Sequence, residues 1–240
     1  MMRFTTMKTK LRKYPSIFLI LLLAISSCFL TGCVNQHPKD SKKSSQGESV
    51  ETMLEITDPK EKQAVLNAKA KVKALSGNPR IVATSPAVAD ICDKLDLDLV
   101  GVPKSSVSKI PSRYKKVKKV GLAMSPDMEI VSSLNPDWIL APSSLETDLK
   151  PKFEELKNTE YAFLNLRSVQ GMYRSVQELG EIFGKQQEAE KMTKEFTTFY
   201  KSYTKRNKNK KHPKVLVLMG LPGSYVIATE NSYVGSLVKL

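Results

Sequence analysis

Short apolar runs alternate with segments of helical periodicity along much of the chain. Residues 80–84 (RIVAT) and 97–103 (LDLVGVP) are rich in β-branched and apolar side chains, as buried strands are. Residues 87–95 between them place apolar side chains at helical spacing. Ser85 and Pro86 supply an N-cap and a first-turn proline for that helix. The pattern therefore predicts a strand–helix–strand unit.

Two further units repeat this order. In the second, residues 119–121 predict a strand, Ser125 begins a helix that runs to Leu134, and residues 138–141 predict the next strand. In the third, a helix that follows Ser144 leads to a strand over residues 161–164. Strands that alternate with helices predict a parallel α/β sheet, whose ligands bind beyond the carboxyl ends of the strands.

The C-terminal part has a different pattern. Residues 171–183 and 185–207 both show helical spacing, and the second stretch is unusually long. A strand is then predicted over residues 215–219, followed by a glycine turn over 220–223 and a second strand over 225–228. Asn231 is the predicted N-cap of a final helix. Residues 213–240 are too few to bury the apolar faces of the strands and helix that they form, so we expect an incomplete second lobe. The alternative is a single domain in which this segment joins the first sheet.

The first 33 residues are organised like a bacterial lipoprotein signal peptide. A basic segment precedes an apolar run over residues 17–30, which is too short to cross a membrane comfortably. The run ends in Leu-Thr-Gly-Cys, which resembles the lipobox and predicts cleavage before Cys33 and diacylation of its thiol. Cys28 lies in a weaker match, and an uncleaved signal anchor is the alternative. Residues 34–50 are polar and typical of a flexible tether.

The net charge of +14 is typical at first sight of a nucleic-acid binder. The predicted signal peptide contains five of the basic residues and no acidic residue, so the processed chain would carry +9. Basic residues concentrate in residues 104–119 and 185–214, but they are not interleaved with aromatic side chains as in a base-stacking surface. We interpret both segments as solvated surface beside an anionic membrane and cell wall, with no nucleic-acid partner.

Few residues in the chain suit catalysis. The sequence has no Gly-x-Ser-x-Gly motif, phosphate-binding loop or zinc-ligand spacing, and its two histidines are His37 and His212. Cys92 falls on the apolar stripe of the helix over residues 87–95 and is expected to be a buried free thiol. We therefore expect a binding protein and not an enzyme.

Three stretches together resemble the substrate-binding lipoproteins of bacterial iron-complex ABC importers: residues 80–103, 119–142 and 213–240. The middle stretch has the most specific pattern, a Val-Gly turn, Ser-Pro-Asp, an acidic residue and then Leu-Asn-Pro-Asp before a strand. The segment HPKVLVLMGLPGSY and the turn Gly-Leu-Ala-Met-Ser-Pro are most similar to the haem-binding receptors of that family.

The resemblance implies an α/β, two-lobed, periplasmic-binding-protein-like fold with a single long and stiff interlobe helix, here with a truncated second lobe. The chain would begin with a signal peptide over residues 1–32 and a lipid-anchored tether and linker over 33–78. An N-terminal α/β lobe would follow over 79–184, then an interlobe helix with a basic linker over 185–212 and the start of a C-terminal lobe over 213–240.

The resemblance also implies haem as the transported ligand and Met124 as an axial ligand of its iron. A thioether sulfur is a known axial ligand of haem iron, and Met124 directly precedes the predicted helix start at Ser125. The alternative is that Met124 fills a gap in the core. The family supplies the other axial ligand as a histidine in the second lobe. No residue here matches it, because His212 precedes the first strand of that lobe.

Haem propionates need hydrogen-bond donors, which the N-termini of helices provide. The candidate ligand-binding residues at the two predicted helix starts are Thr84, Ser85, Ala87 and Ser125. The alternative is that these residues only cap their helices. Across the cleft, Tyr225 or Tyr233 would stack on the porphyrin. Lys104 or Lys109, near the cleft, would attract the propionates.

The resulting hypothesis is a lipid-anchored receptor on the extracellular face of a Gram-positive cell membrane. It would take haem from upstream cell-surface haem-binding proteins and deliver it to an ABC permease and its ATPase. One alternative is a receptor of the same fold for a ferric siderophore or another iron complex, and a more remote one is a surface enzyme or adhesin. Docking in this family uses acidic side chains, and Glu129 and Glu181 are available.

Overall fold

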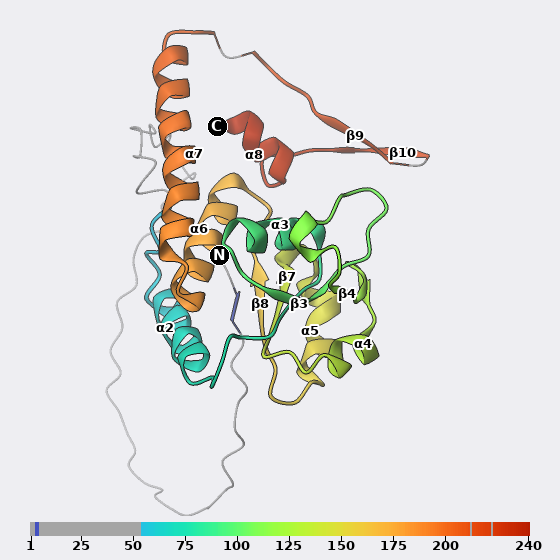
Figure 1. Cartoon of the computed structure of the whole chain (residues 1–240). Helices are drawn as coiled ribbons and strands as arrows, with labels where there is room; N and C mark the ends of the chain where they lie inside the picture. The colour runs from blue at the N-terminus through green and yellow to red at the C-terminus, as the bar shows by residue number, and fades with distance from the viewer. Residues whose placement is uncertain (1–2, 5–53, 212, 222) are drawn as a thin grey trace, which may run out of the picture. The chain divides into compact units, whose positions relative to one another are not determined.

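The computed structural model describes residues 3–4, 54–211, 213–221 and 223–240 (Figure 1). The predicted cleavage site, the predicted lipidation of Cys33 and the predicted tether over residues 34–50 fall outside the described residues, and so does His212. Within the described ranges, no helix has both the length and the apolar character that crossing a bilayer requires.

A six-stranded sheet organises the N-terminal lobe. Its order is β1 (Arg3–Phe4), β8 (Glu160–Leu164), β7 (Trp138–Pro142), β2 (Ile81–Ala83), β3 (Leu99–Val102) and β4 (Lys118–Lys119). The strands from β8 to β4 are parallel, whereas β1 is antiparallel to β8. The predicted parallel α/β sheet is therefore confirmed. Since β1 belongs to the predicted signal peptide, cleavage would leave β8 as an edge strand.

Alternate residues of the central strands contribute to two separate hydrophobic clusters. In β7, Trp138 and Leu140 belong to the first cluster, and Ile139 and Ala141 belong to the second. Helices α2 (Pro59–Lys73), α3 (Pro86–Lys94), α6 (Val169–Phe183) and α7 (Gln186–Asn207) complete the first cluster, and α4 (Met128–Ser133) and α5 (Glu146–Glu154) complete the second (Figure 1). Burial on both faces explains why the strands have nearly continuous apolar sequences.

Two helices that follow less obvious sequence signals pack against α6. Helix α2 lies in the segment interpreted above as linker, and its N-cap Asp58 accepts the Lys60 N–H at 2.8 Å. Its residues Val65 and Ala68 are buried in the first cluster. Helix α7 confirms the long helix predicted from residue 185. It approaches α6 closely at Gly180, where a Cβ atom would lie 2.6 Å from the Cβ of Ala189.

A carboxyl group is buried where α6 contacts α2. Glu178 is completely buried, and neither of its carboxyl oxygens has a hydrogen-bond partner among the described residues. Glu61 of α2 is buried nearby. Burial first, and then the Glu61 carboxyl group, raise the pKa of Glu178 to about 9. Glu178 is therefore held in its neutral form at pH 7.

The C-terminal segment forms a hairpin and a short helix. Strand β9 (Leu218–Leu221) pairs with β10 (Ser224–Ile227), and α8 (Tyr233–Lys239) follows. Among the described residues neither strand joins the six-stranded sheet, so the expectation that this segment joins the first sheet is wrong. The strand predicted over 215–219 begins later, because its pairing with β10 starts at Leu218. The predicted cap Asn231 is also wrong, because it is the Ser232 Oγ that accepts the Gly235 N–H at 3.2 Å.

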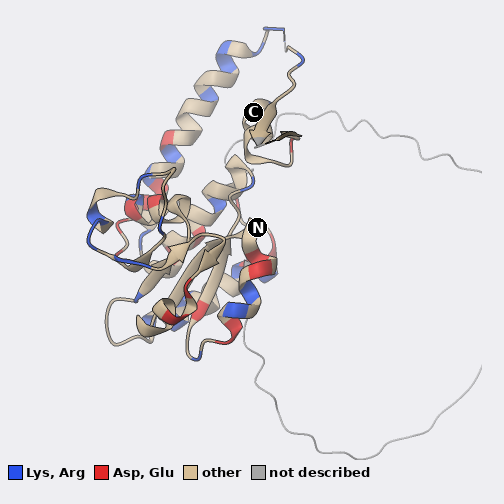
Figure 2. Ribbon diagram, turned by 90° about the vertical axis from the view of Figure 1, so that its right-hand side faces the viewer, with Lys and Arg blue, Asp and Glu red and all other residues tan. Residues whose placement is uncertain are grey.

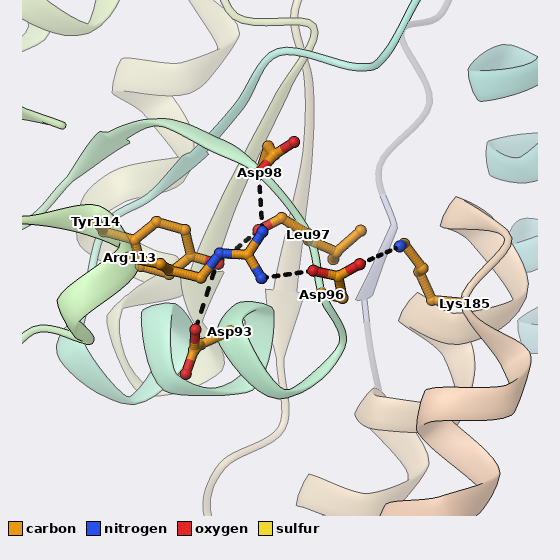
Figure 3. Close-up of polar contacts among 7 residues, drawn as sticks. All are labelled: Asp93, Asp96, Leu97, Asp98, Arg113, Tyr114 and Lys185. Carbon is orange, nitrogen blue, oxygen red and sulfur yellow. Dashed lines mark hydrogen bonds and ion pairs between the residues drawn. The ribbon is translucent and has the colours of Figure 1, made fainter.

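The basic residues of the lobe differ in whether they are ion-paired. Lys and Arg occur along α7 and in the loops (Figure 2), and Lys104 and Lys109 are exposed as expected. Arg113, in the 3-10 helix η1 (Ser112–Tyr114), instead contacts three carboxylates (Figure 3). These are Asp96 at 2.7 Å, Asp98 at 2.8 Å and Asp93 at 3.9 Å. Arg113 is exposed, as expected of a surface segment, and it is also ion-paired because the acidic turn after α3 lies beside it.

The same cluster reaches the base of α7. Asp96 also binds Lys185 Nζ at 3.0 Å, and Lys185 directly precedes the first residue of α7. Tyr114 OH donates to the Leu97 carbonyl at 2.5 Å and holds η1 against this turn. Hydrogen bonds from Arg113 and then Lys185 lower the pKa of Asp96. The cluster thus joins η1, the turn after α3 and the start of the long helix.

Replacing Glu178 with glutamine should stabilise the protein, and more so at pH 8 than at pH 5. In the unfolded chain a glutamate ionises near its ordinary pKa of about 4.3, whereas Glu178 stays protonated in the fold up to about pH 9. Wild-type stability therefore falls as the pH rises between those values, and glutamine removes this loss. We expect a gain of about 1–3 kcal/mol at pH 8, measured by urea denaturation.

The control for this experiment is Glu129→Gln, which changes an exposed glutamate of α4 and should show no such pH trend. A Glu178→Gln protein with wild-type stability at both pH values would contradict the expectation.

Replacing Arg113 with glutamine should lower Tm by about 2–4 °C at low salt, because three carboxylates lose their shared partner. Arg113→Gln combined with Lys185→Gln should lower Tm by less than the sum of the two single changes, because both cations bind Asp96.

The lowered pKa of Asp96 means that this stabilisation exists above its unfolded pKa and is lost as the pH falls through its folded value. Thermal melts at two salt concentrations measure these effects, with the exposed Lys115→Gln as control. Strictly additive shifts would argue against coupling through Asp96.

Candidate functional site

The loops that follow the parallel strands contain most of the predicted ligand-binding residues. Parallel strands end at one edge of a sheet, and ligands bind beyond that edge. Thr84 follows β2, Lys104 follows β3 after one residue, and Arg167 lies shortly after β8. Met124 follows β4, beyond a short connection. Residues that are far apart in sequence are thereby brought to one side of the lobe.

Met124 lies in the connection of a small hairpin. Strands β5 (Gly121–Leu122) and β6 (Ser125–Pro126) pair antiparallel, with Leu122 opposite Ser125, so that Ala123 and Met124 join them. The Met124 side chain is 73% exposed. The alternative in which Met124 fills a gap in the core is therefore wrong, and its thioether is accessible to a ligand.

The helix after Met124 begins later than predicted. Ser125 and Pro126 form strand β6, and α4 starts at Met128 with Asp127 as its N-cap. The Asp127 carboxylate accepts the Ile130 N–H at 3.1 Å, which is the bond that the sequence interpretation assigned to a serine cap. The prediction of a helix N-terminus at Ser125 is wrong. Ser125 is instead an exposed hairpin residue beside Met124.

The backbone holds this hairpin firmly against the end of the sheet. The Lys104 N–H donates to the Gly121 carbonyl at 2.6 Å, and the Asp127 N–H donates to the Val120 carbonyl at 2.8 Å. Gly121 has a φ of 92°, and a Cβ atom at this position would lie 2.8 Å from the Asp127 nitrogen. A glycine is therefore required at the start of the hairpin. The exposed Lys104 side chain belongs to the segment that this hydrogen bond fixes.

At the other predicted helix start, the side chains serve the local structure. Thr84 is buried, and its hydroxyl donates to the Leu140 carbonyl at 3.3 Å. Ser85 is buried and caps α3 as predicted, accepting the Val88 N–H at 3.3 Å. Ala87 is the exposed residue of this group. The capping alternative thus describes the Ser85 side chain, while Ala87 is exposed.

A cavity of about 820 Å³ is lined by residues of α3, α6, α7 and the start of α8. Ala87 and Tyr233 line it together with an apolar group that includes Met172, Tyr173 and Met192. The Tyr173 ring stacks on Phe196 of α7 at 4.4 Å between centroids. By contrast, Tyr225 is 77% exposed on β10 and, like Met124, lines none of the cavities described here.

Two smaller cavities share Arg167, a residue that no sequence motif marks. One of about 510 Å³ includes Glu146, Lys150 and Glu154, and the other, of about 280 Å³, includes Ser144 and Tyr233. The signal that could have identified Arg167 was its place three residues after the predicted strand over 161–164, where a parallel sheet puts its ligand-binding loops.

Other candidate groups in the lobe are already engaged or inert. Cys92 is buried as predicted, and burial raises the pKa of its thiol to about 12. Glu181, one of the two available docking acids, is paired with Lys69 and accepts a hydrogen bond from Gln186, while Glu129 is exposed. No set of three or more His, Cys, Asp or Glu side chains in the described part of the chain is arranged to bind a metal ion.

Comparisons with known proteins show which family this chain is similar to. Residues 81–240 match the family model described as periplasmic binding protein. The high-affinity heme uptake system protein IsdE of Staphylococcus aureus is 40% identical over 166 residues, which cover 69% of this chain and 56% of that protein. The chain thus spans little more than half the length of this curated relative.

Solved structures show the same likeness. The structure of S. aureus IsdE complexed with heme has a TM-score of 0.63 and 38% identity, covering 68% of this chain and 63% of that one. An ABC transporter substrate-binding protein from Listeria monocytogenes EGD-e has a TM-score of 0.63 and 45% identity, covering 68% and 62%. The petrobactin-binding protein YclQ from Bacillus subtilis, at 22% identity, a TM-score of 0.59 and coverages of 68% and 59%, shares the fold alone. With a family match over residues 81–240 and the parallel sheet that carries it, this chain belongs to the periplasmic binding protein family.

Proposed function

We propose that this chain is part of a haem-binding receptor of an ABC importer. The observation that carries the proposal is the 40% identity to IsdE over 166 residues, together with an exposed methionine at the turn where the resemblance expects an axial ligand. The role is that of a binding protein, which delivers its ligand unchanged to a permease and its ATPase. Other parts of the receptor's action, including uptake from cell-surface haem-binding proteins, follow from the family resemblance.

Met124 would bind the haem iron through its thioether sulfur. Its position in a two-residue hairpin connection leaves the sulfur accessible, and no other side chain needs to move to expose it. The hydrogen bonds at Gly121 and Asp127 fix the hairpin on the sheet, so the sulfur is presented by a pre-organised backbone. Haem itself supplies the iron and the flat apolar face, and the protein supplies position and exclusion of water.

The propionates would meet donors at the same edge of the sheet. The exposed Ala87 lies in the first turn of α3, where backbone N–H groups face the helix end and favour negative charge. Lys104 is exposed next to the hairpin of Met124 and offers an ammonium group. Ser125 and Tyr225 are exposed and remain candidates for ligand contact, whereas the buried Thr84 and Ser85 act by holding the turn.

Anchoring and docking complete the proposed role. Diacylation at Cys33, which lies outside the described residues, would tether the receptor to the extracellular face of the membrane of a Gram-positive bacterium. Glu129 is an exposed acid on α4 and is free to contact a basic site on the permease, whereas Glu181 is already paired with Lys69.

A receptor for a ferric siderophore is the second candidate. It is supported by the fold that this chain shares with the petrobactin-binding protein YclQ. The two candidates differ in how iron is held. A siderophore encloses its iron in its own oxygen ligands and needs no protein sulfur, whereas haem leaves its axial positions open.

Titration of the 240-residue chain with haemin should shift the Soret band, and Met124→Ala should alter that spectrum and weaken binding by about tenfold or more. Met124→Leu should have the same spectral effect, because it keeps the volume of the side chain but removes the sulfur. Met128→Leu is the matched control, because it removes a sulfur from the first residue of α4 and should bind like wild type. If the Met124 substitutions leave the haemin spectrum unchanged, or if the chain prefers a ferric siderophore to haemin, the haem assignment is refuted.

Gly121→Ala should also weaken haemin binding by about tenfold, although it changes no atom that contacts iron. A Cβ atom at φ 92° costs about 1–3 kcal/mol in backbone strain and collides with the Asp127 nitrogen, so the hairpin must shift. Gly77→Ala is the control, because a Cβ atom there meets nothing within 4 Å. Equal haemin affinity for Gly121→Ala and Gly77→Ala would show that the hairpin does not position the ligand.

A further inference from the structure

A small cavity lies where the loops after β7 and β8 meet the turn before α8. It has a volume of about 280 Å³ and is lined by Ser144, Leu166, Arg167, Asn231, Ser232 and Tyr233. Four of these residues have hydroxyl or amide groups, one is a cation, and none is an acid. A cavity of this size with this lining suits a small anionic group.

Arg167 is the residue that gives the cavity its charge. Its exposed guanidinium makes no ion pair with a described residue, in contrast to Arg113, which contacts three carboxylates. Its backbone is nevertheless fixed, because its N–H donates to Asn165 Oδ1 at 3.2 Å and the preceding Leu166 N–H donates to the Leu164 carbonyl at 3.0 Å. The guanidinium is thus carried by an ordered turn but has no ion-pair partner in the described part of the chain.

The opposite wall comes from the C-terminal segment. The Val169 N–H at the start of α6 donates to Ser236 Oγ at 3.3 Å, which ties α8 to the lobe. The Ser232 hydroxyl is occupied, because it donates to the Thr229 carbonyl at 2.7 Å and accepts the Gly235 N–H. Asn231 and Tyr233 therefore provide the donors on this wall, facing a cavity that Arg167 lines from the other side.

The neighbouring cavity of about 510 Å³ also includes Arg167 but suits an anion less well. Its lining contains Glu146 and Glu154 as well as Lys150, so acids and bases balance there. In the smaller cavity Arg167 acts without an opposing carboxylate. A guanidinium presents parallel N–H donors that match the two oxygens of a carboxylate.

We propose that the 280 Å³ cavity binds a carboxylate of the transported ligand, with Arg167 as the residue that recognises it. For the ligand proposed above this carboxylate is a haem propionate, so the inference rests on the proposed function. Arg167 then sets specificity, because it distinguishes a porphyrin with free acid groups from one without them. Asn231 and Tyr233 assist by donating hydrogen bonds from the C-terminal segment.

The test compares haemin with its dimethyl ester, in which both propionates are esterified and uncharged. Both ligands are titrated into the full 240-residue chain under the same detergent conditions. We expect Arg167→Gln to weaken haemin binding by about tenfold and to change ester binding by less than about twofold. Arg167→Lys should recover part of the loss for haemin, because it keeps the charge but not the paired donors.

Arg206→Gln is the matched control, because it removes the same charge from an exposed position on α7 that lines neither cavity. Equal weakening of both ligands by Arg167→Gln, or no weakening of haemin, would overturn the carboxylate site while leaving the haem receptor intact. A wild-type chain that gives no Soret shift with haemin would overturn the proposed function and, with it, this inference.

Discussion

Burial of both faces of the parallel sheet is the constraint on which the rest of the structure depends. Trp138 and Leu140 pack on one side while Ile139 and Ala141 pack on the other, so the central strands expose neither face to solvent. Each connection must therefore cross one face and return to the same end. The loops that follow the strands collect at the carboxyl edge, which is where Met124, Lys104 and Arg167 are found. The site is a consequence of this packing.

The strands and α3 could be predicted from sequence because their signals are local and agree with the final packing. Ser85 and Pro86 begin a helix as expected. The same dipeptide at Ser125 does not, because Ser125 pairs with Leu122 across the hairpin and Asp127 provides a better-placed cap. Identical local signals thus have different outcomes when strand pairing competes with capping.

Charge interactions between distant segments were the least predictable part. Arg113 follows Asp98 by 15 residues and precedes Lys185 by far more, and no periodicity connects them. The position of Met124 came from a family resemblance, and the exposure of its side chain came from the structure. Arg167 and Tyr233 share a cavity only because α8 is tied to the start of α6, a contact between segments more than 60 residues apart. Sequence patterns report local preference, and these contacts depend on the whole fold.

The base of α7 determines how far its other end can travel. With 22 residues, the helix is about 33 Å long, so a tilt of about 5° at its first turn moves its last turn by about 3 Å. The contacts that oppose such a tilt include the Lys185–Asp96 ion pair, the close approach of Ala189 to Gly180 and the stacking of Tyr173 on Phe196. The orientation of the whole helix is therefore set at its first turns, by an ion pair and by close packing. If either of these first-turn contacts lengthens by a fraction of an ångström, the resulting displacement of the helix is several-fold larger at Asn207.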